Sequence, residues 1–324
     1  MNEFIYFDTF MQEALYSESG FFNTENVRSS EKGDFLTSPE VSQYFGVIIR
    51  SWIDSKNFYE NIVEFGSGTG SLIEQIGLKN ITAVELSSTA RKVIDNKGIL
   101  SVKSYEDLNI LSADLVYGNE ILDNIPCSIA VYKENNWYEK VVDISKDNLS
   151  YAYQPIRDEQ LNWINLNKIE PNNNYEVELQ TNIDNLIANL INRFQPKSFL
   201  FFDYGYEQKN RNKRKYKSLL RTYKKHHLSV DPIDDPGNVD ITYDINFSAV
   251  KENFKSLGYS VSLKKQREFL LENGFNDIYD DLKNQYITLE GIEKLKINSQ
   301  LNGLKAILDS NGLGDFYCLI AEKI

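Results

Sequence analysis

A glycine-rich turn between a short apolar strand and a helix constrains the fold of this chain more than any other feature. Residues 62–65 are Ile-Val-Glu-Phe, residues 66–70 are Gly-Ser-Gly-Thr-Gly, and a helical pattern begins at Leu72. Glycines at such a junction let the backbone turn tightly and approach a ligand closely. A strand, a tight turn and a helix in this order are typical of an α/β fold with a parallel sheet.

The pattern of strands and helices continues along the chain and supports this fold class. Because strands separated by helices are joined by right-handed crossovers, we expect a mostly parallel, Rossmann-like sheet flanked by helices. The sequence predicts strands at 81–86, 113–117, 198–203 and 316–320, and helices at 4–16, 72–76, 88–96 and 182–194, with a further helix that starts at Ser38-Pro39. Residues 129–132 and 137–142 flank a turn and predict a hairpin, whereas residues 206–240 are basic and predict a loop.

The composition excludes several classes of protein. Apolar residues make up 41% and charged residues 25%, a balance that supports a buried core rather than disorder. The net charge of −12 argues against nucleic acid and anionic membranes as partners. No apolar run reaches 18 residues, the first charged residues are acidic, and there are only two cysteines, so we predict a cytoplasmic protein without membrane insertion.

One local segment departs from this acidic balance. Nine of the 35 basic residues fall within residues 209–225. A solvated loop and a docking surface for an acidic protein partner both fit this pattern, and RNA binding is a third option that few aromatic residues support. The only two histidines, His226 and His227, are adjacent and lack the spacing of metal ligands, so no metal site is predicted.

The glycine turn favours a nucleoside cofactor without phosphate over a dinucleotide. A dinucleotide fingerprint would place its third glycine at position 71, where this chain has Ser71. Glu64 suits a cationic ligand group better than a pyrophosphate, and S-adenosylmethionine carries an ammonium and a sulfonium. Glu85 follows the next strand, where a carboxylate can accept both ribose hydroxyls. A tight turn without any ligand remains the alternative.

A second motif follows the strand at 113–117. Asn119 and Glu120 lie beyond the carboxyl end of this strand, where open α/β sheets bind their ligands, and would face the methyl group to be transferred. Carboxylates can also hold a guanidinium by paired hydrogen bonds. The residues alone leave open whether Asn119 and Glu120 form a site or cap a helix.

Three longer strings are specific. They are Gly-Asp-Phe-Leu-Thr-Ser-Pro-Glu-Val-Ser at 33–42, Asn-Glu-Ile-Leu-Asp-Asn-Ile-Pro at 119–126 and Pro-Gly-Asn-Val-Asp-Ile-Thr at 236–242. Together they resemble strings of the MidA-type methyltransferases, a family that includes the mitochondrial complex I assembly factor that methylates arginine. Shorter matches occur at 64–70, 85–87, 203–205, 219–223, 246–248 and 312–316, whereas residues 127–197 and 258–310 match weakly. The chain departs from the family at Ser67, where proline is common, and at Asn124-Ile125, where Ala-Leu is common.

The resemblance implies a class I methyltransferase fold that binds S-adenosylmethionine and methylates an arginine of a protein substrate, with a respiratory-complex subunit as one candidate. It implies that Asn119, Glu120 and Asp123 are catalytic and face the acceptor. The implied cofactor-binding residues are Gly33, Asp34, Ser38, Pro39, Glu64, Gly66, Ser67, Gly68, Thr69, Gly70, Glu85, Leu86 and Asn119.

We expect three parts along the chain. Residues 1–60 would form a helical extension that closes over the cofactor, residues 61–126 and 198–324 the methyltransferase core, and residues 127–197 an insertion with a hairpin and a helix. Two other functions stay open. A non-catalytic assembly factor would keep its function after Glu120→Gln or Gly68→Val, and a small-molecule methyltransferase would need a closed apolar pocket, which the insertion could supply.

Overall fold

A computed structural model describes residues 3–23, 37–56, 59–145, 148–173, 175–213, 218–224, 227–228 and 231–324. The chain divides into two compact units. Unit 1 comprises Met1–Glu25, Leu122–Asn189 and Gly205–Leu257, and unit 2 comprises Asn26–Ile121, Leu190–Tyr204 and Gly258–Ile324. The three-part division expected from the sequence stays a prediction.

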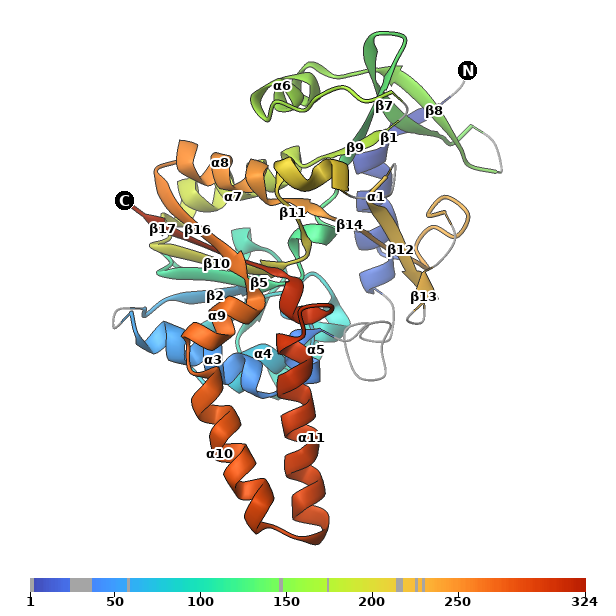
Figure 1. Ribbon diagram of the computed structural model, residues 1–324. Coiled ribbons are helices and arrows are strands. Elements are labelled where there is room, and N and C mark those ends of the chain that lie inside the picture. The colour runs from blue at the N-terminus through green and yellow to red at the C-terminus, as the bar shows by residue number, and fades with distance from the viewer. Residues whose placement is uncertain are drawn as a thin grey trace. The chain divides into compact units, whose positions relative to one another are not determined.

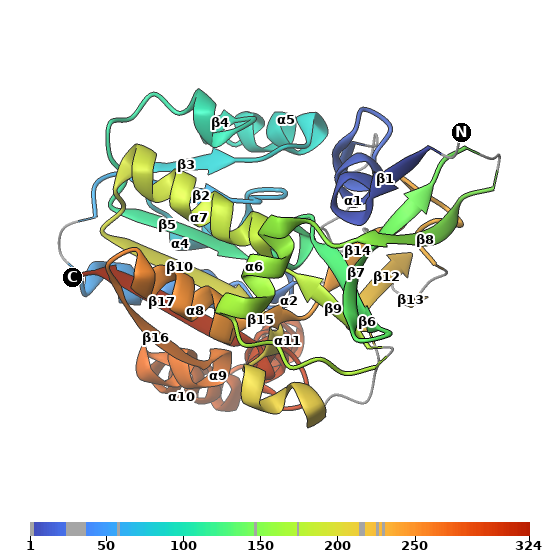
Figure 2. The ribbon, with the colours of Figure 1, turned by 90° about the horizontal axis from the view of Figure 1, so that it is seen from above.

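Unit 2 is built on a sheet of seven described strands (Figures 1 and 2). These are β2 Ile62–Phe65, β3 Ile81–Val84, β4 Ser101–Val102, β5 Leu115–Asn119, β10 Ser198–Asp203, β16 Tyr259–Lys265 and β17 Tyr317–Lys323. Their order is β16-β17-β10-β5-β2-β3-β4. The strands from β10 to β4 run parallel, whereas β17 is antiparallel to β10 and to β16, so the predicted mostly parallel α/β sheet is confirmed.

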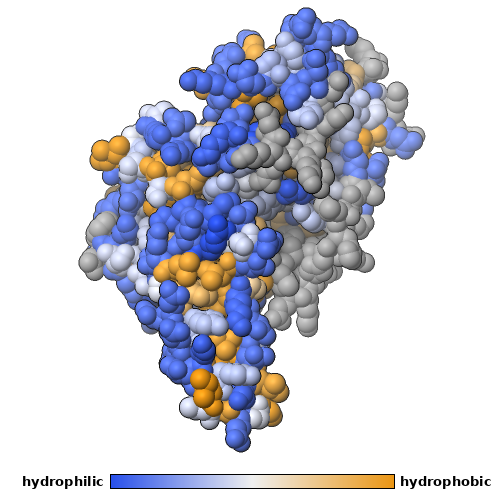
Figure 3. Space-filling view, in the orientation of Figure 1, coloured by the Kyte–Doolittle hydropathy of each residue, from blue (hydrophilic) through white to orange (hydrophobic). Residues whose placement is uncertain are grey.

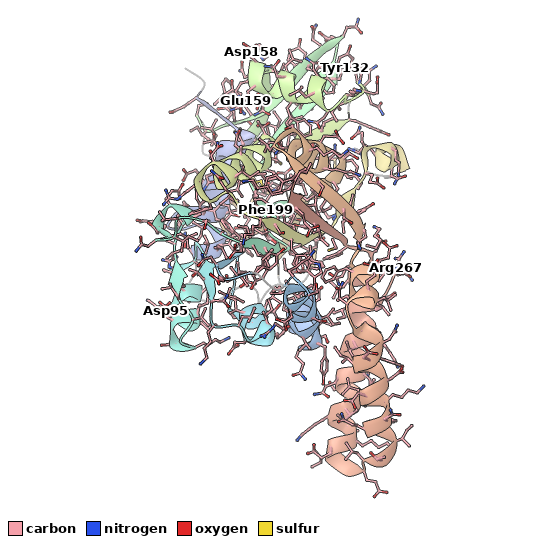
Figure 4. All side chains as sticks on the ribbon, turned by 90° about the vertical axis from the view of Figure 1, so that its left-hand side faces the viewer. Asp95, Tyr132, Asp158, Glu159, Phe199 and Arg267 are labelled. Carbon is pink, nitrogen blue, oxygen red and sulfur yellow. The ribbon has the colours of Figure 1, made fainter. Side chains whose placement is uncertain are left out.

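Helices pack on this sheet through aromatic side chains. Its described helices are α2 Ser38–Val41, α3 Tyr44–Asp54, α4 Ser71–Ile76, α5 Ser88–Asn96, α9 Gln266–Glu272, α10 Phe275–Thr288 and α11 Gly291–Leu308, with short 3-10 turns at Tyr105–Asp107 and Leu313–Asp315. On one face of β10, Phe202 contacts Phe45 of α3 and Phe269 of α9, with ring centroids 5.1 Å apart in each pair. Phe199, which is labelled in Figure 4, lies on the opposite face because side chains alternate along a strand. It contacts Tyr259, with ring centroids 5.6 Å apart.

The helices α10 and α11 lie side by side as a hairpin (Figure 1). Leu301, Leu304 and Ile307 anchor the last turns of α11 in the core, where a Cβ at Gly303 would lie 2.6 Å from the carbonyl oxygen of Val41. The connecting end of the hairpin carries exposed apolar side chains (Figure 3), which are Ile287, Ile292 and Leu295. No helix among the described residues is both long and apolar enough to cross a membrane.

Unit 1 contains smaller sheets. A five-stranded sheet has the order β1-β7-β6-β9 with β8 paired to β7, a three-stranded sheet has the order β13-β12-β14, and β11 pairs with β15. The bounds are β1 Phe4–Tyr6, β6 Ser128–Lys133, β7 Asn136–Asp143, β8 Ser150–Pro155, β9 Glu176–Leu179, β11 Gly205–Tyr206, β12 Leu220–Lys224, β13 His227–Leu228, β14 Asp240–Tyr243 and β15 Ile245–Asn246. Its helices are α1 Phe7–Tyr16, α6 Asp158–Leu166 and α8 Phe247–Ser256, with 3-10 turns at Phe21–Asn23, Leu122–Asn124 and Gln208–Lys213, and α7 Thr181–Phe194 begins in unit 1 and ends in unit 2.

The hairpin predicted between residues 129 and 142 is confirmed as β6 and β7. Its turn residues Glu134 and Asn135 have φ of 51° and 64°, the two positive values typical of a two-residue type I′ hairpin turn. Two other expectations were wrong. Residues 4–6 form β1 rather than the first turn of a helix, because they pair with β7, and residues 220–224 form β12 rather than a loop, because they pair with β14.

Candidate active site

The glycine turn connects β2 to α4 at the carboxyl edge of the unit 2 sheet. Gly66, Gly68 and Gly70 have φ of 64°, 52° and 77°, a left-handed conformation that is strained for residues with a side chain. The N–H of Gly66 donates to the carbonyl of Val84 at 2.9 Å, and a Cβ at Gly66 would lie 3.2 Å from Ile121. The three glycines therefore serve a turn that packs closely against neighbouring elements.

Glu85 follows β3 and binds the turn directly. Its Oε2 accepts the N–H of Gly68 at 2.9 Å, and its Oε1 accepts the N–H of Ser87 at 2.8 Å. Burial raises the pKa of the Glu85 carboxyl above its ordinary value, although these backbone hydrogen bonds and nearby Arg91 oppose the shift. The next residue, Leu86, is 40% exposed.

Glu64 lies on β2 beneath the turn and is 3% exposed. Its Oε2 has no hydrogen-bond partner within the described part of the chain. The pKa of Glu64 is raised from 4.5 to about 8, chiefly because of burial. A hydrogen bond from Ser67 opposes this shift, and the charges of Glu85 and Glu40 add to it. Since an unpaired buried carboxyl is costly, Glu64 fits a site whose ligand supplies a positive group.

Asn119 and Glu120 lie at the end of β5, next to β2. Phe65 and Gly118 are register partners, so the acidic motif starts beside the glycine turn. The Asn119 Nδ2 donates to Glu120 Oε1 at 3.0 Å, while the buried Asn119 Oδ1 finds no hydrogen-bond partner among the residues that the structure describes. Glu120 has φ of 52°, and its N–H donates to the carbonyl of Phe202 at 2.8 Å.

The N-terminal string contributes the short helix α2 to the same unit. Gly33 and Asp34, two of the predicted cofactor residues, lie outside the described residues. Ser38 is fully buried and exchanges hydrogen bonds with Gln266, while the carbonyl of Pro39 accepts Gln75 Nε2 at 2.7 Å. Glu40, which was not among the predicted site residues, accepts a hydrogen bond from the Ser71 hydroxyl at 3.1 Å.

The remaining predicted turn residues lie close by. Ser67 is 7% exposed, and Thr69 Oγ1 shares a hydrogen bond of 2.6 Å with Ser71 Oγ. The structure thus gathers the predicted residues Glu64 to Gly70, Glu85 and Asn119 at one edge of one sheet. Their individual roles stay predictions.

Comparison with known proteins identifies the family. A family model described as "Putative S-adenosyl-L-methionine-dependent methyltransferase" matches residues 46–262, more than half of the chain. The chain belongs to this methyltransferase family. The predicted cofactor, S-adenosylmethionine, and the predicted class of enzyme are thereby confirmed.

Named relatives and solved structures agree with this assignment. The chain is 26% identical over 317 residues to the mitochondrial protein arginine methyltransferase NDUFAF7 homolog of Caenorhabditis elegans, covering 83% of this chain and 72% of that protein. It is 25% identical over 316 residues to the mitochondrial protein arginine methyltransferase NDUFAF7 of Rattus norvegicus, covering 82% of this chain and 70% of that protein. A COG1565 superfamily member from Burkholderia thailandensis bound to S-adenosyl-homocysteine has the same fold, with a TM-score of 0.83, 21% identity, and coverage of 99% of this chain and 88% of that one.

The residues present in this methyltransferase fit its cofactor. S-adenosylmethionine brings an ammonium and a sulfonium, and Oε2 of Glu64 is a buried carboxyl oxygen beside the turn that lacks a partner among the described residues. Each carboxylate oxygen of Glu85 can accept a further hydrogen bond, as two ribose hydroxyls require. The positive φ of the three turn glycines keeps that approach free of Cβ atoms.

Asp123 follows the division between the units and lies in the 3-10 turn Leu122–Asn124 of unit 1. Side chains from other elements of this unit fix the backbone of the turn. Tyr243 OH lies 3.2 Å from the carbonyl of Leu122 and 2.7 Å from that of Ile125, and Tyr16 OH donates to the carbonyl of Asn124 at 3.0 Å. The segment that carries Asp123 is therefore held from β14 and from α1.

Two asparagines complete this hydrogen-bond network. Asn124 Nδ2 donates to Asp240 Oδ1 at 2.9 Å and to the carbonyl of Ile241 at 3.1 Å, and Asn182 Nδ2 donates to the carbonyl of Pro126 at 2.8 Å. Tyr16, Asn182 and Tyr243 were not predicted as supports of the motif. The nearest signal was the string at 236–242, which ends one residue before Tyr243.

The described side chains of the basic segment 209–225 contact groups of unit 1. Lys209 pairs with Glu207 at 3.1 Å, Arg211 donates to the carbonyl of Glu176 at 3.1 Å, and Arg221 pairs with Asp244 at 2.8 Å. The side chains of the other six basic residues in this segment lie outside those that the structure describes. An acidic docking partner stays a prediction.

Proposed function

We propose that this methyltransferase transfers a methyl group from S-adenosylmethionine to a guanidinium nitrogen of an arginine in a protein partner. The named relatives, which are called protein arginine methyltransferases, support this acceptor. The acidic motif at the end of β5 supports it chemically, because a carboxylate and an amide oxygen are groups that bind a guanidinium.

The observation that carries the proposal is the conformation of Glu120. A glutamate at φ of 52° is uncommon and strained, and such strain gathers at functional sites. Glu120 is nevertheless fixed there by its backbone bond to Phe202 and by the side chain of Asn119. A residue that only capped a helix would not need this conformation.

The residues divide the chemistry between them. The bound cofactor supplies an electrophilic methyl group on its sulfonium. Glu120 holds and orients the guanidinium, and the Oδ1 of Asn119 accepts one of its N–H groups. As the new N–C bond forms and the C–S bond breaks, the guanidinium nitrogen loses a proton, which Glu120 accepts and passes to solvent. S-adenosylhomocysteine and a methylated arginine are the products.

Labelled methyl transfer tests this proposal. Purified protein is incubated with S-adenosylmethionine carrying a tritiated methyl group and with an extract of cells that lack the protein. Acid hydrolysates of the labelled proteins are then separated by chromatography. We expect the label in methylarginine, and we expect Glu120→Gln to lower transfer at least a hundredfold. Glu170→Gln, which changes an exposed glutamate, is the matched control and should transfer like the wild type.

The same assay separates the alternatives. Label in the low-mass fraction would indicate a small-molecule acceptor, and cofactor binding without any transfer would indicate a non-catalytic assembly factor. The family resemblance suggests a respiratory-complex subunit as the partner, and this stays a prediction that the identity of the labelled protein bands can test. The cytoplasmic location also stays a prediction, and cell fractionation can test it.

A further inference from the structure

The carboxylate of Glu40, in α2, contacts Ser71, the residue that directly follows the glycine turn. Its Oε1 accepts the hydroxyl of Ser71 at 3.1 Å, and its other oxygen accepts the hydroxyl of Thr37. Since the Ser71 proton is donated to Glu40, the 2.6 Å contact between Thr69 and Ser71 must use the proton of Thr69. A short chain of hydroxyl groups therefore leads from the turn to this carboxylate.

The helix that carries Glu40 is held in place on three sides. Ser38 exchanges hydrogen bonds with Gln266 of α9, and Gln75 of α4 donates to the carbonyl of Pro39 at 2.7 Å. The backbone of α11 approaches the carbonyl of Val41 so closely that only glycine fits at position 303. These contacts leave the Glu40 carboxylate a defined position beside the turn.

The second observation comes from Glu64, the buried carboxyl described above. Its Oε2 lacks a hydrogen-bond partner within the described part of the chain. The charge of Glu40 is one of those that raise the pKa of Glu64, so the two carboxyls lie within electrostatic reach of each other. The ion pairs that the described residues form include neither Glu40 nor Glu64.

A cationic ligand group with several donors would satisfy both the unpaired oxygen of Glu64 and the remaining acceptor positions of Glu40. A carboxylate has about four acceptor positions, so Glu40 can accept further hydrogen bonds beyond those from Thr37 and Ser71. Of the two positive groups of S-adenosylmethionine, the sulfonium has no hydrogen to donate, whereas the ammonium has three. The ammonium is therefore the group of the cofactor that can donate hydrogen bonds to these carboxyls.

We infer that Glu40 is a cofactor-binding residue that, together with Glu64, holds the ammonium of the methionine part of the cofactor. Glu85, at the end of the neighbouring strand β3, is left for the ribose. This inference concerns the cofactor alone and does not depend on which acceptor the enzyme methylates.

Two ligands that differ at the amino-acid end test the inference. S-adenosylhomocysteine has the ammonium but no sulfonium, and 5′-methylthioadenosine lacks the whole amino-acid end. Both are titrated by calorimetry into the wild type and into Glu40→Gln. We expect the variant to bind S-adenosylhomocysteine at least tenfold more weakly and 5′-methylthioadenosine within twofold of the wild type.

The control is Glu293→Gln, which changes an exposed glutamate of α11 that pairs with Lys296 at 2.8 Å, and it should bind both ligands like the wild type. An equal loss for both ligands in Glu40→Gln would overturn the inference, because it would mean that Glu40 only supports the turn. Unchanged binding of both ligands would overturn it as well. Retained binding of 5′-methylthioadenosine also shows that the variant is folded.

Discussion

The backbone N–H of Gly68 donates to Oε2 of Glu85 at 2.9 Å and ties the turn after β2 to the end of β3. This bond is possible because Gly68 has φ of 52°. The turn and the predicted ribose carboxylate thus form one hydrogen-bonded unit before any cofactor enters. Substitutions at either residue are expected to act on cofactor binding more than on the fold.

A methyl group at position 68 tests the turn. We expect Gly68→Ala to cost about 1–2 kcal/mol of stability because of the left-handed backbone, and to weaken binding of S-adenosylmethionine at least tenfold. The control is Gly98→Ala, since Gly98 has φ of 73° and a Cβ there would meet no atom of the described residues within 4 Å. It should lose similar stability in urea unfolding and keep its affinity in calorimetry. Equal affinity loss in both variants would contradict this role of the turn.

Replacing Glu120 by glycine relieves its backbone strain and is expected to have opposite effects on stability and on methyl transfer. Glycine adopts φ of 52° readily, so Glu120→Gly is expected to keep or raise the free energy of unfolding, by up to about 1 kcal/mol. Methyl transfer should fall at least a hundredfold, while the dissociation constant of S-adenosylmethionine stays within threefold. Urea unfolding, transfer assays and calorimetry measure the three quantities. A variant that transfers methyl groups normally would refute the role of this carboxylate.

The hydroxyl of Tyr243 is expected to position the turn that carries Asp123. Tyr243→Phe removes the hydroxyl proton that the carbonyls of Ile125 and Leu122 share, and it should cost about 1–3 kcal/mol of stability. We expect kcat for methyl transfer to fall at least tenfold while cofactor affinity is unchanged. Tyr259→Phe is a close match, because this buried tyrosine also donates to a backbone carbonyl, that of Pro196 at 2.6 Å. It should lose comparable stability and keep its kcat, and a parallel fall in kcat would contradict the positioning role.

The raised pKa of Glu64 predicts how stability depends on pH. The ordinary value of 4.5 becomes about 8 in the folded chain, so the folded state holds this proton more tightly than the unfolded state. The resulting stabilisation is complete below about pH 4.5 and is lost as the pH rises through about 8. Glu64→Gln cannot titrate at this position. The difference in unfolding free energy, variant minus wild type, should therefore increase between about pH 5 and pH 9. A constant difference across this range would show that the carboxyl is not buried as described.

Local features of the sequence predicted the glycine turn and the strand β10. The turn at 66–70 is recognisable because positive φ restricts the choice of residue to glycine within a few positions. The strand β10 is recognisable because all six of its residues are buried, so that Phe199 to Phe202 follow one another without polar interruption. Such signals need no knowledge of distant contacts.

Long-range contacts explain what the sequence could not show. Glu40 becomes part of the site through Ser71, which lies 31 residues further along the chain, and Tyr243 reaches Leu122 across 121 residues. Two of the strands that the sequence analysis missed show the same cause. The apolar residues of β1 have helical spacing and therefore predicted a helix, and the basic residues of β12 predicted a loop. Both segments are strands because each pairs with a partner strand.

The most direct test of the central claim is the identity of the residue that receives the methyl group. After incubation of the purified enzyme with tritiated S-adenosylmethionine and protein acceptors, acid hydrolysis and chromatography separate methylarginine from other methylated amino acids. We predict that the label elutes with methylarginine, in equal amount to the S-adenosylhomocysteine formed, and disappears with Glu120→Gln. Label in another residue, or undiminished methylarginine in that variant, would contradict the claim.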